Sequence, residues 1–368
     1  MAHSSQTESV PADLLAGVYS GPNPATALRI RGMGAEYVLL PGQQKFVLGS
    51  APSPICDICV ERRHVSYSHA LLERRNGRVR ISDLSSKNGL VYRGERLVQF
   101  EIGPGDQFAI DETVFYALND EMRMGYPVLA EILGAQPMEA IDDLLIEAVR
   151  GGHVLLRAEP GCDQERLARV LHRVSLRRTS PFVIAAAGAE PGAGDEPTSQ
   201  LVAHARNGTM LLRLDAVGAK LDPTFVETLL RPESNVRLIL CARSLKEAID
   251  LVTEAIAGSA HRVEISPVRA RSGDIASLLE RWFVDRCSQL RFSDFTEANQ
   301  AALRSYRWPG NLEEVRDVAD LLIKLAPYAS ERKAAMQVDL PRTSLKRLLD
   351  DIKLVIPLLH TLAPEPSK

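Results

Sequence analysis

The chain has 368 residues, of which 45% are hydrophobic and 25% charged, and this composition excludes a largely disordered protein. Two or three domains of ordinary size fit the length. The formal net charge of -3 excludes a global attraction to nucleic acid, so any such binding must depend on a local basic patch. No apolar run approaches the ~18 residues that span a bilayer, and the first residues do not follow a signal-peptide pattern. We therefore expect a cytoplasmic protein without a membrane partner.

The cysteine pattern argues against a metal centre. Cys56 and Cys59 form a single CxxC, and no second pair of Cys or His follows at the spacing of a zinc site. The five cysteines are therefore predicted to be free thiols in a reducing compartment. We expect no metal and no cofactor.

The first two predicted parts are an arm and an all-β domain. Residues 1–26 are polar and rich in Pro, Ser and Gly, which predicts a flexible arm. Between residues 27 and 118, short alternating runs such as 78–82 and 113–117 are separated by Gly, Pro and Asn. Short strands with turn residues between them are typical of an antiparallel β-sandwich.

Three motifs occur in order within this all-β region. Gly49-Ser50 follows an apolar run, Ser66 and His69 form an SxxH motif, and the segment 83–89 ends in Asn-Gly. Together they resemble a forkhead-associated (FHA) domain, a module that binds phosphothreonine peptides. The resemblance covers residues 27–118.

The resemblance implies roles for the loop residues. Ser66 and Ser86 would donate hydrogen bonds to a phosphate, Asn88 would bind the peptide backbone, and His69 would brace the loop. The alternative is that Ser66, Ser86 and Asn88 are turn residues without a ligand.

One position departs from the FHA pattern. The phosphate-binding arginine that follows the glycine is Ser50 in this chain. A hydrogen bond to a charged group contributes on the order of 1.5–3 kcal/mol, so its loss weakens phosphate binding. Arg62, Arg63 or Lys87 from neighbouring loops could supply the missing charge. Binding of an unphosphorylated partner stays open as an alternative.

The pattern of apolar and polar residues changes after a predicted linker at 119–126. From 127 to 270, apolar strands alternate with helix-length amphipathic stretches. Such alternation predicts a parallel sheet with crossover helices. After that, nearly every segment is predicted to be helical, first at 271–328 and then at 329–368.

The segment 153–169 has the strand, loop and helix order of a P-loop. A functional P-loop reads GxxxxGK[ST], because backbone amides and Lys hold the phosphates and the hydroxyl holds Mg²⁺. At the corresponding positions the second Gly is Asp163, the Lys is Gln164 and the hydroxyl residue is Glu165. Carboxylates therefore lie where phosphates would bind, which predicts that ATP is not hydrolysed.

Two later motifs carry a second resemblance. The segments 267–275 (PVRARSGDI) and 306–315 (YRWPGNLEEV) resemble the lid signatures of bacterial enhancer-binding proteins, the sigma-54 activators. The resemblance implies an AAA+ fold, with an α/β core at 127–270 and a helical lid at 271–328. It also implies assembly into a homo-oligomer.

The other catalytic parts of this family are missing as well. By the resemblance, the catalytic Glu would fall at Ala216 or within two residues of it, and no Asp-Glu pair occurs there. Glu313 takes the place of the nucleotide-sensing arginine, and Leu251 and Ala257 take those of the arginine fingers. The link 185–199 stands where an activator would insert its sigma-54-contacting loop. The sequence therefore predicts a pseudo-ATPase.

The C-terminal part carries a third resemblance. The segment 334–349 (AAMQVDLPRTSLKRLL) resembles a Fis-type helix-turn-helix, with Asp339 in the turn and Pro341 at the start of the second helix. The residues expected to contact DNA are Arg342, Thr343, Ser344, Lys346 and Arg347. On the other face of the same helix, Leu345, Leu348 and Leu349 are expected to lie in the core. The alternative is an ordinary helical hairpin with a solvated basic face. The apolar stretch 352–362 is expected to pack against a partner or another subunit.

The sequence thus predicts a multidomain protein with an all-β FHA sandwich, an α/β AAA+ core with a helical lid, and a small C-terminal helix-turn-helix. Its predicted function is non-catalytic transcription regulation, with DNA and a threonine-phosphorylated or related protein as partners. Two alternatives stay open: an FHA-based scaffold that does not bind DNA, and a protein that binds ATP structurally.

Overall fold

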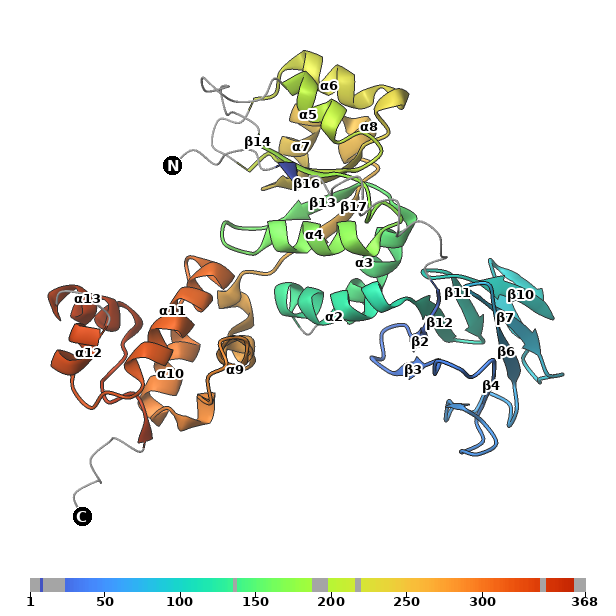
Figure 1. The fold of residues 1–368 in the computed structure, drawn as a ribbon, viewed down its shortest axis with the longest axis horizontal. Coiled ribbons are helices and arrows are strands. Elements are labelled where there is room, and N and C mark those ends of the chain that lie inside the picture. The colour runs from blue at the N-terminus through green and yellow to red at the C-terminus, as the bar shows by residue number, and fades with distance from the viewer. Residues whose placement is uncertain are drawn as a thin grey trace. The chain divides into compact units, whose positions relative to one another are not determined.

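A computed structural model describes residues 7–8, 24–134, 138–186, 198–215, 220–337 and 342–360. It contains two compact units (Figure 1). The first combines Met1–Arg157 with Glu165–Val263, and the second combines Ala158–Gln164 with Glu264–Lys368. The short segment Ala158–Gln164 therefore belongs with the C-terminal helices, although the sequence on both sides of it belongs to the first unit.

The N-terminal part of the first unit is a β-sandwich, as the alternating runs predicted. One sheet has the order β10-β7-β6-β4-β5 and the other β3-β2-β12-β11-β8-β9. Neighbouring strands are antiparallel except β4 and β5. The strands are β2 (Ala27–Ile30), β3 (Glu36–Val38), β4 (Lys45–Gly49), β5 (Ile58–Cys59), β6 (Ala70–Arg75), β7 (Arg78–Asp83), β8 (Leu90–Tyr92), β9 (Glu95–Leu97), β10 (Gln99–Ile102), β11 (Gln107–Ile110) and β12 (Thr113–Leu118).

The core of the sandwich follows the two-residue period of its strands. Alternate residues such as Leu72 and Ile81 are fully buried between the sheets. Phe108 and Phe115 stack there with their ring centroids 5.0 Å apart. The packed sandwich provides a rigid base for the loops at its ends.

The linker predicted at 119–126 is wrong, because these residues begin helix α2 (Asp120–Leu133). The Asn119 side chain caps this helix by accepting a hydrogen bond from the Met122 amide at 2.7 Å. Asp120 and Glu121 in the first turn stabilise the helix further by facing its positive end. An Asn-Asp pair that resembles a turn in sequence is thus a helix start.

A buried carboxylate joins the sandwich to helix α3 (Met138–Arg150). Asp142 is fully buried, and it accepts hydrogen bonds from the Tyr116 hydroxyl and the Gly32 amide, both at 2.7 Å. The Arg29 guanidinium lies 3.7 Å from the same carboxylate. Burial raises the pKa of Asp142, and these donors oppose that rise. The sandwich and α3 therefore share a polar core.

The α/β part of the first unit holds a six-stranded sheet in the order β1-β14-β15-β16-β13-β17. Its central strands β14, β15, β16 and β13 are parallel, as strand and helix alternation predicted. The strands are β13 (Val154–Arg157), β14 (Phe182–Ala186), β15 (Thr209–Arg213), β16 (Arg237–Ala242) and β17 (His261–Glu264). The helices are α4 (Gln164–Val174), α5 (Thr198–His204), α6 (Pro223–Leu230), α7 (Leu245–Val252) and α8 (Glu254–Ala257), with the 3-10 turn η1 (Pro232–Ser234).

The N-terminal arm predicted at 1–26 is structured in part. Strand β1 (Thr7–Glu8) pairs antiparallel with β14, at the edge of the α/β sheet. An edge strand leaves backbone donors and acceptors free for such an addition. Ala25 is buried in the sandwich core, so residues close to the first sandwich strand also have fixed places.

The second unit is helical, as predicted. Its elements are η2 (Val268–Asp274), α9 (Ile275–Asp285), η3 (Phe292–Asp294), α10 (Glu297–Ser305), α11 (Asn311–Leu325), α12 (Glu331–Gln337) and α13 (Arg342–Ile352). Figure 1 shows α9, α10 and α11 gathered in one bundle. Trp308 is fully buried and donates from Nε1 to the Leu303 carbonyl at 3.1 Å, which fixes the loop before α11.

The stretch after α13 packs within its own unit instead of against a partner, which corrects the sequence expectation for 352–362 as far as residue 360. Leu354 and Leu358 are buried. The Asn299 side chain of α10 donates to the Val355 and Leu358 carbonyls at 2.9 and 3.2 Å and accepts from the Val355 amide at 2.8 Å. Fully buried Asn299 thus binds the tail back onto the helical unit.

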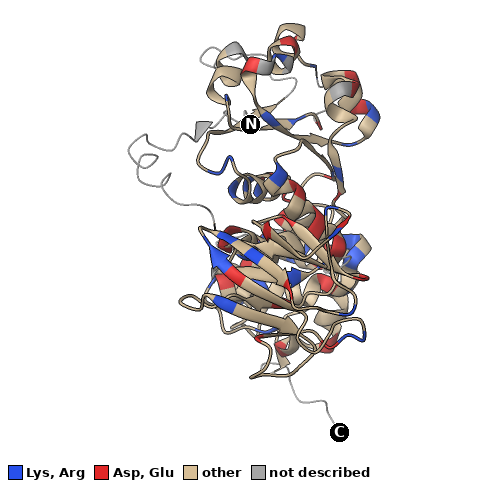
Figure 2. Cartoon of the chain, turned by 90° about the vertical axis from the view of Figure 1, so that its right-hand side faces the viewer, with Lys and Arg blue, Asp and Glu red and all other residues tan. Residues whose placement is uncertain are grey.

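Charged residues of both signs are interspersed along the chain in Figure 2. In the residues that the structure describes, no helix is both long and apolar enough to cross a membrane. Within the same residues, no group of three or more His, Cys, Asp or Glu side chains could hold a metal ion. All five cysteines are free thiols.

Candidate functional site

Three loops meet at one end of the sandwich. They follow β4, precede β6 and follow β7. The Ser50 amide donates to the Ser66 carbonyl at 3.0 Å, and the Lys87 amide donates to the Ser66 hydroxyl at 3.0 Å. At Gly49 an added Cβ would lie 2.3 Å from the Tyr67 carbonyl oxygen, so this close approach requires glycine. The structure therefore brings together the motifs that are separate in sequence.

The buried His69 side chain holds two of these loops through hydrogen bonds to their backbone. It is fully buried, and its Nδ1 accepts a hydrogen bond from the Ser66 amide at 3.0 Å. Its Nε2 lies 3.2 Å from the Gly89 carbonyl, so the neutral ring that carries its proton on Nε2 satisfies both partners. Burial lowers the pKa of His69, which favours this neutral form.

Ser66 and Asn88 each have unused hydrogen-bonding capacity. The Asn88 Nδ2 donates to the His64 carbonyl at 2.8 Å, while its Oδ1 has no partner among the described residues. The Ser66 hydroxyl accepts from Lys87, and no described residue accepts its proton. One free acceptor and one free donor suit a peptide backbone and a phosphate, respectively.

Ser86 differs from Ser66 and Asn88 because its hydroxyl is already hydrogen-bonded within its own loop. Its hydroxyl donates to Asp83 Oδ1 at 2.5 Å and accepts from the Gly89 amide at 2.9 Å. Ser85 next to it has a φ of 57°, so the turn is tight. A bond from Ser86 to phosphate, as predicted, requires its bond to Asp83 to break.

The cations near these loops are exposed. Arg62, Arg63 and Lys87 lie at the surface, and Ser50 is half-buried. The Arg62 guanidinium donates to the Met33 sulfur at 3.2 Å. Arg63 and Lys87 have no ion pair with any described residue, so their charges are available to a ligand.

The loop 158–164, between β13 and α4, contains carboxylates that bind to the second unit's own helices. The Asp163 carboxylate forms an ion pair with Arg316 of α11, and its side chain is only 7% exposed. The Glu159 carboxylate pairs with both terminal nitrogens of Arg269 at 2.5 Å. This arginine lowers the pKa of Glu159, and Glu159 raises the pKa of Arg269.

Backbone contacts complete the attachment of this loop. The Asn311 side chain donates to the Pro160 carbonyl at 2.9 Å and accepts from the Val268 amide at 3.0 Å. Gly161 has a φ of 78°, and a Cβ there would lie 2.1 Å from the Gly310 carbonyl oxygen. The Glu313 amide donates to the Gly161 carbonyl at 3.2 Å. The loop is therefore closed by protein groups on several sides.

The positions predicted for the arginine fingers belong to the hydrophobic core. Ala257 is fully buried in the α/β core, and Leu251 packs against that core. Ala216, at the predicted position of the catalytic Glu, lies outside the described residues, as does most of the link 185–199.

Helix α13 exposes part of the predicted DNA-contacting set. Thr343, Lys346 and Arg347 are exposed, and their spacing of three and four residues places them on one helical face. Leu345 and Leu349 are buried on the opposite face, as predicted. The side chains of Arg342 and Ser344, and the turn with Asp339 and Pro341, lie outside the part of the chain that the structure describes.

Leu348 differs from its expectation as a core residue, because its side chain is 38% exposed. It follows the exposed Arg347 on the boundary between the polar and apolar faces of the helix. A residue at such a boundary is shielded on one side alone.

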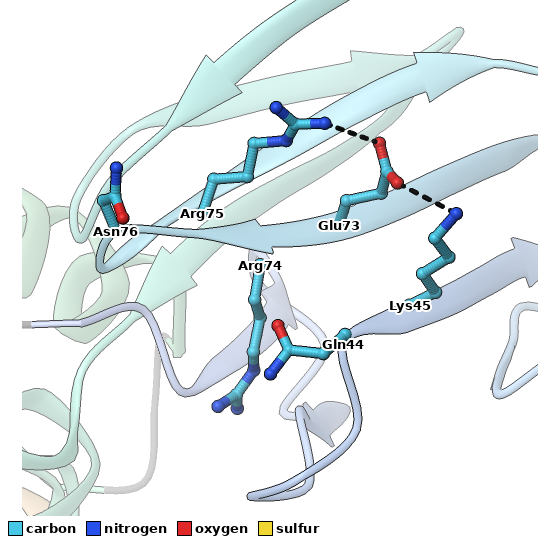
Figure 3. A pocket seen from close by; sticks show the side chains of 6 residues that line it. All are labelled: Gln44, Lys45, Glu73, Arg74, Arg75 and Asn76. Atoms are coloured by element: carbon cyan, nitrogen blue, oxygen red, sulfur yellow. Dashed lines mark ion pairs between the residues drawn. The ribbon is translucent and has the colours of Figure 1, made fainter.

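A hollow at the far end of the sandwich has its charges already paired. It measures about 480 Å³ and lies beside Lys45 at the start of β4, whereas the Gly49 loop follows the end of that strand. Figure 3 shows Glu73 between Lys45 and Arg75, at 3.2 and 3.8 Å. Arg74 points away from this trio and donates to the Leu39 carbonyl. We assign no ligand to this hollow.

The family model of the FHA domain matches residues 46–111, which include all three loops. The chain carries an FHA domain. A solved FHA domain, that of the CT664 protein from Chlamydia trachomatis, is 29% identical to it; the match covers 25% of this chain and 95% of that one, with a TM-score of 0.23.

The chain is also similar in sequence to sigma-54 enhancer-binding regulators. Nitric oxide reductase transcription regulator NorR2 of Cupriavidus necator is 32% identical over 276 residues, which cover 62% of this chain and 50% of NorR2. A Nif-specific regulatory protein of Sinorhizobium fredii is 28% identical over 239 residues, 54% of this chain and 40% of the relative. The matches thus span half or less of these relatives.

A solved structure is also similar to part of this chain. NtrX from Brucella abortus, in complex with ADP, is 18% identical; the match covers 58% of this chain and 68% of NtrX, with a TM-score of 0.41.

Two features of the sites were not predicted from sequence. The pairing of Asp163 with Arg316 joins residues 153 positions apart, and no local pattern marks Arg316. The second is the use of the Ser86 hydroxyl by Asp83, for which the short spacing of the two residues in the FHA loop was the available signal.

Proposed function

We propose that this protein is a transcriptional regulator that acts by binding and does not hydrolyse ATP. Its FHA domain binds a threonine-containing, preferably phosphorylated, segment of a partner protein. Its degenerate AAA+ part supports assembly into an oligomer, and helix α13 contacts DNA.

The observation that carries the proposal is the ion pair between Asp163 and Arg316. In a functional P-loop, backbone amides and a lysine surround the nucleotide phosphates. Here a carboxylate lies in that loop and already has a cationic partner from α11. A nucleotide phosphate would have to displace this carboxylate from Arg316.

The FHA loops support partner binding. The free Ser66 hydroxyl proton and Asn88 Oδ1 can meet a phosphate and a peptide backbone, and Arg63 and Lys87 can supply the charge that Ser50 lacks. Guanidinium and ammonium groups form the strongest hydrogen bonds to phosphate when they approach it directly. Because Ser50 replaces the arginine, we expect phosphorylation to raise the affinity for a peptide less than it would with an arginine at this position.

The exposed face of α13 supports DNA binding. Thr343, Lys346 and Arg347 lie near the beginning of the helix, and a recognition helix reads the major groove with its N-terminal residues. Similar proteins are named as regulators of transcription, which is a further reason to expect DNA binding.

Nucleotide binding and DNA binding can be tested on the full chain. Titration with a fluorescent ATP analogue and Mg²⁺ should give no saturable signal, and no phosphate should be released from ATP. In genomic fragment selection, the chain should enrich specific DNA, and Lys346→Ala/Arg347→Ala should lose that enrichment.

The outcomes separate the alternatives. Mg²⁺-dependent phosphate release that disappears in a Glu165→Ala variant would contradict the non-catalytic part of the proposal. Saturable ATP binding without release would favour a structural nucleotide. Peptide binding without any DNA enrichment would favour a scaffold.

A further inference from the structure

The second unit contains a hollow of about 710 Å³ that none of the sites above uses. We call it the arginine basin; its lining residues are Arg269, Ala270, Ser272, Arg304, Ser305, Tyr306 and Arg307. They come from η2, from the end of α10 and from the loop before α11. Three guanidinium groups line the basin, and no carboxylate does.

The charges of the basin are only partly neutralised. Arg269 pairs with Glu159, which lies outside the lining. Arg304 lies 4.8 Å above the Phe292 ring, and neither Arg304 nor Arg307 forms an ion pair with a described residue. This differs from the hollow in Figure 3, where Glu73 neutralises two cations. The basin is therefore an anion-attracting surface.

Its shape favours a large anion over a small one. Every lining residue except Tyr306 is exposed, so the basin is shallow and open. Sites for small molecules bury about 70–90% of the ligand surface, which an open basin does not do. A polyanion that lies across the surface needs no such enclosure.

The position of the basin within the helical unit indicates which polyanion it would bind. The tail that directly follows α13 is hydrogen-bonded at Val355 and Leu358 to Asn299 of α10, and Arg304 lies at the end of the same α10. The basin and the helix that carries Thr343, Lys346 and Arg347 therefore belong to neighbouring parts of the helical unit. Guanidinium groups suit phosphodiester oxygens because they present several donors in a planar fork.

We propose that the arginine basin is a second DNA contact, in which Arg304 and Arg307 bind backbone phosphates that flank the segment contacted by α13. This inference rests on the proposed DNA-binding function. The contacts are to phosphates, so they add affinity without sequence preference. The basin also gives a protein of net charge -3 the local positive surface that DNA binding requires.

The test uses the full chain and a random-sequence 40-base-pair duplex, because phosphate contacts do not depend on sequence. Arg304→Gln/Arg307→Gln should reduce affinity at low salt roughly tenfold and reduce the log–log salt slope by about 1.8 units, or about 0.9 per phosphate contact. Arg231→Gln/Arg262→Gln is the matched control, since it removes two exposed charges from the first unit. It should leave both quantities unchanged.

Folding is checked separately, because Arg304 packs on Phe292. Arg307→Gln alone removes an exposed side chain and should still reduce the slope by about 0.9 units. Arg304→Lys should retain most of the slope, because it keeps the charge.

The results of the basin test and of the α13 test are independent. If the basin variants bind like the control while Lys346→Ala/Arg347→Ala weakens binding, the basin proposal is wrong and the proposed function stands. If the basin variants alone weaken binding, Arg304 and Arg307 do bind phosphates, but the proposed DNA contact of α13, and with it the flanking position of the basin, is wrong. If the unaltered chain binds no DNA, both are wrong.

Discussion

Among the four FHA loop residues, Ser66 and Asn88 each have a hydrogen-bonding group without a partner in the described structure. The side chains of Ser86 and His69 instead form hydrogen bonds that hold the loops. Four motif residues of similar polarity thus divide into two with groups that a ligand could use and two whose groups hold the loops. Because Ser50 carries no charge, neighbouring loops would have to supply the positive charge that a phosphate requires at this site. The ligand preference of the domain therefore depends on very few atoms.

Replacing Ser50 with Arg should increase affinity for phosphothreonine peptides roughly ten- to a hundredfold, because one hydrogen bond to a charged group contributes about 1.5–3 kcal/mol. Asn88→Ala should weaken binding of both phosphorylated and unphosphorylated peptides. Fluorescence anisotropy with peptides selected on a threonine and phosphothreonine array measures both effects. Gln99→Ala is the control, since it removes an exposed amide outside the loops. Equal binding by all variants would place the ligand elsewhere.

His172 makes the first unit sensitive to acid. The ring is 7% exposed and lies 3.0 Å from the Thr209 hydroxyl, and burial lowers its pKa to about 4. The unfolded chain binds a proton near pH 6.5, so stability present at pH 7 is lost as the pH falls from 6.5 toward 4. We expect about 1–2 kcal/mol of this loss at pH 5.

Calorimetric melting at pH 7 and pH 5 measures this effect. His172→Gln should reduce the pH dependence, whereas His360→Gln, which removes an exposed histidine, should not. An unchanged pH dependence in His172→Gln would contradict the assignment.

At the scale of elements, the loop 158–164 acts as a structural part of the helical unit. Asp163 has a φ of 62°, a left-handed conformation that Gly adopts freely and Asp tolerates. The loop therefore keeps a glycine-like backbone while its side chain binds Arg316. In this way a segment with the sequence position of a phosphate loop stabilises α11 and η2.

Arg316→Ala should lower the stability of the helical unit by about 3 kcal/mol, because it leaves a buried carboxylate without its partner. Urea unfolding followed by tryptophan fluorescence reports on this unit, since Trp282 and Trp308 are the two tryptophans of the chain. Asp163→Gly/Arg316→Ala should recover much of the loss. The control Arg286→Ala breaks a more exposed pair with Asp320 and should cost less than about 1 kcal/mol. Similar losses for Arg316→Ala and Arg286→Ala would contradict the buried-charge explanation.

At the scale of the whole molecule, the proposed contacts of one small helix and one basin would not provide tight specific DNA binding alone, because specific interfaces bury about 1,000–2,500 Å² of protein. Assembly of two or more copies would supply the area. The packing of the tail on Asn299 holds α13 to α10, so each copy presents α13 as part of one helical unit.

Footprinting on selected genomic fragments should therefore show paired protected half-sites, with centres about one helical turn or a multiple of it apart. Sedimentation of the chain with and without DNA measures the number of copies. A single protected half-site bound by one copy would contradict the oligomer model.

The sequence by itself was sufficient for the order and class of the domains. Strand periodicity and turn residues predicted the sandwich, and the ordered GS, SxxH and NG motifs predicted the FHA domain, because these signals are local in the chain. The loss of the P-loop residues was likewise readable from Asp163, Gln164 and Glu165. Residues 119–126 were predicted to be a linker, whereas Asn119 caps α2, because turns and helix caps use the same residue types.

Tertiary structure decided what the substituted residues do. Only packing brings Arg316 to Asp163, Asn299 to the tail after α13, and Arg269, Arg304 and Arg307 into one basin. These partners are far apart in sequence, so no periodicity or spacing relates them. The sequence therefore determined which groups were lost from the phosphate loop, and the fold determined which charges took their place.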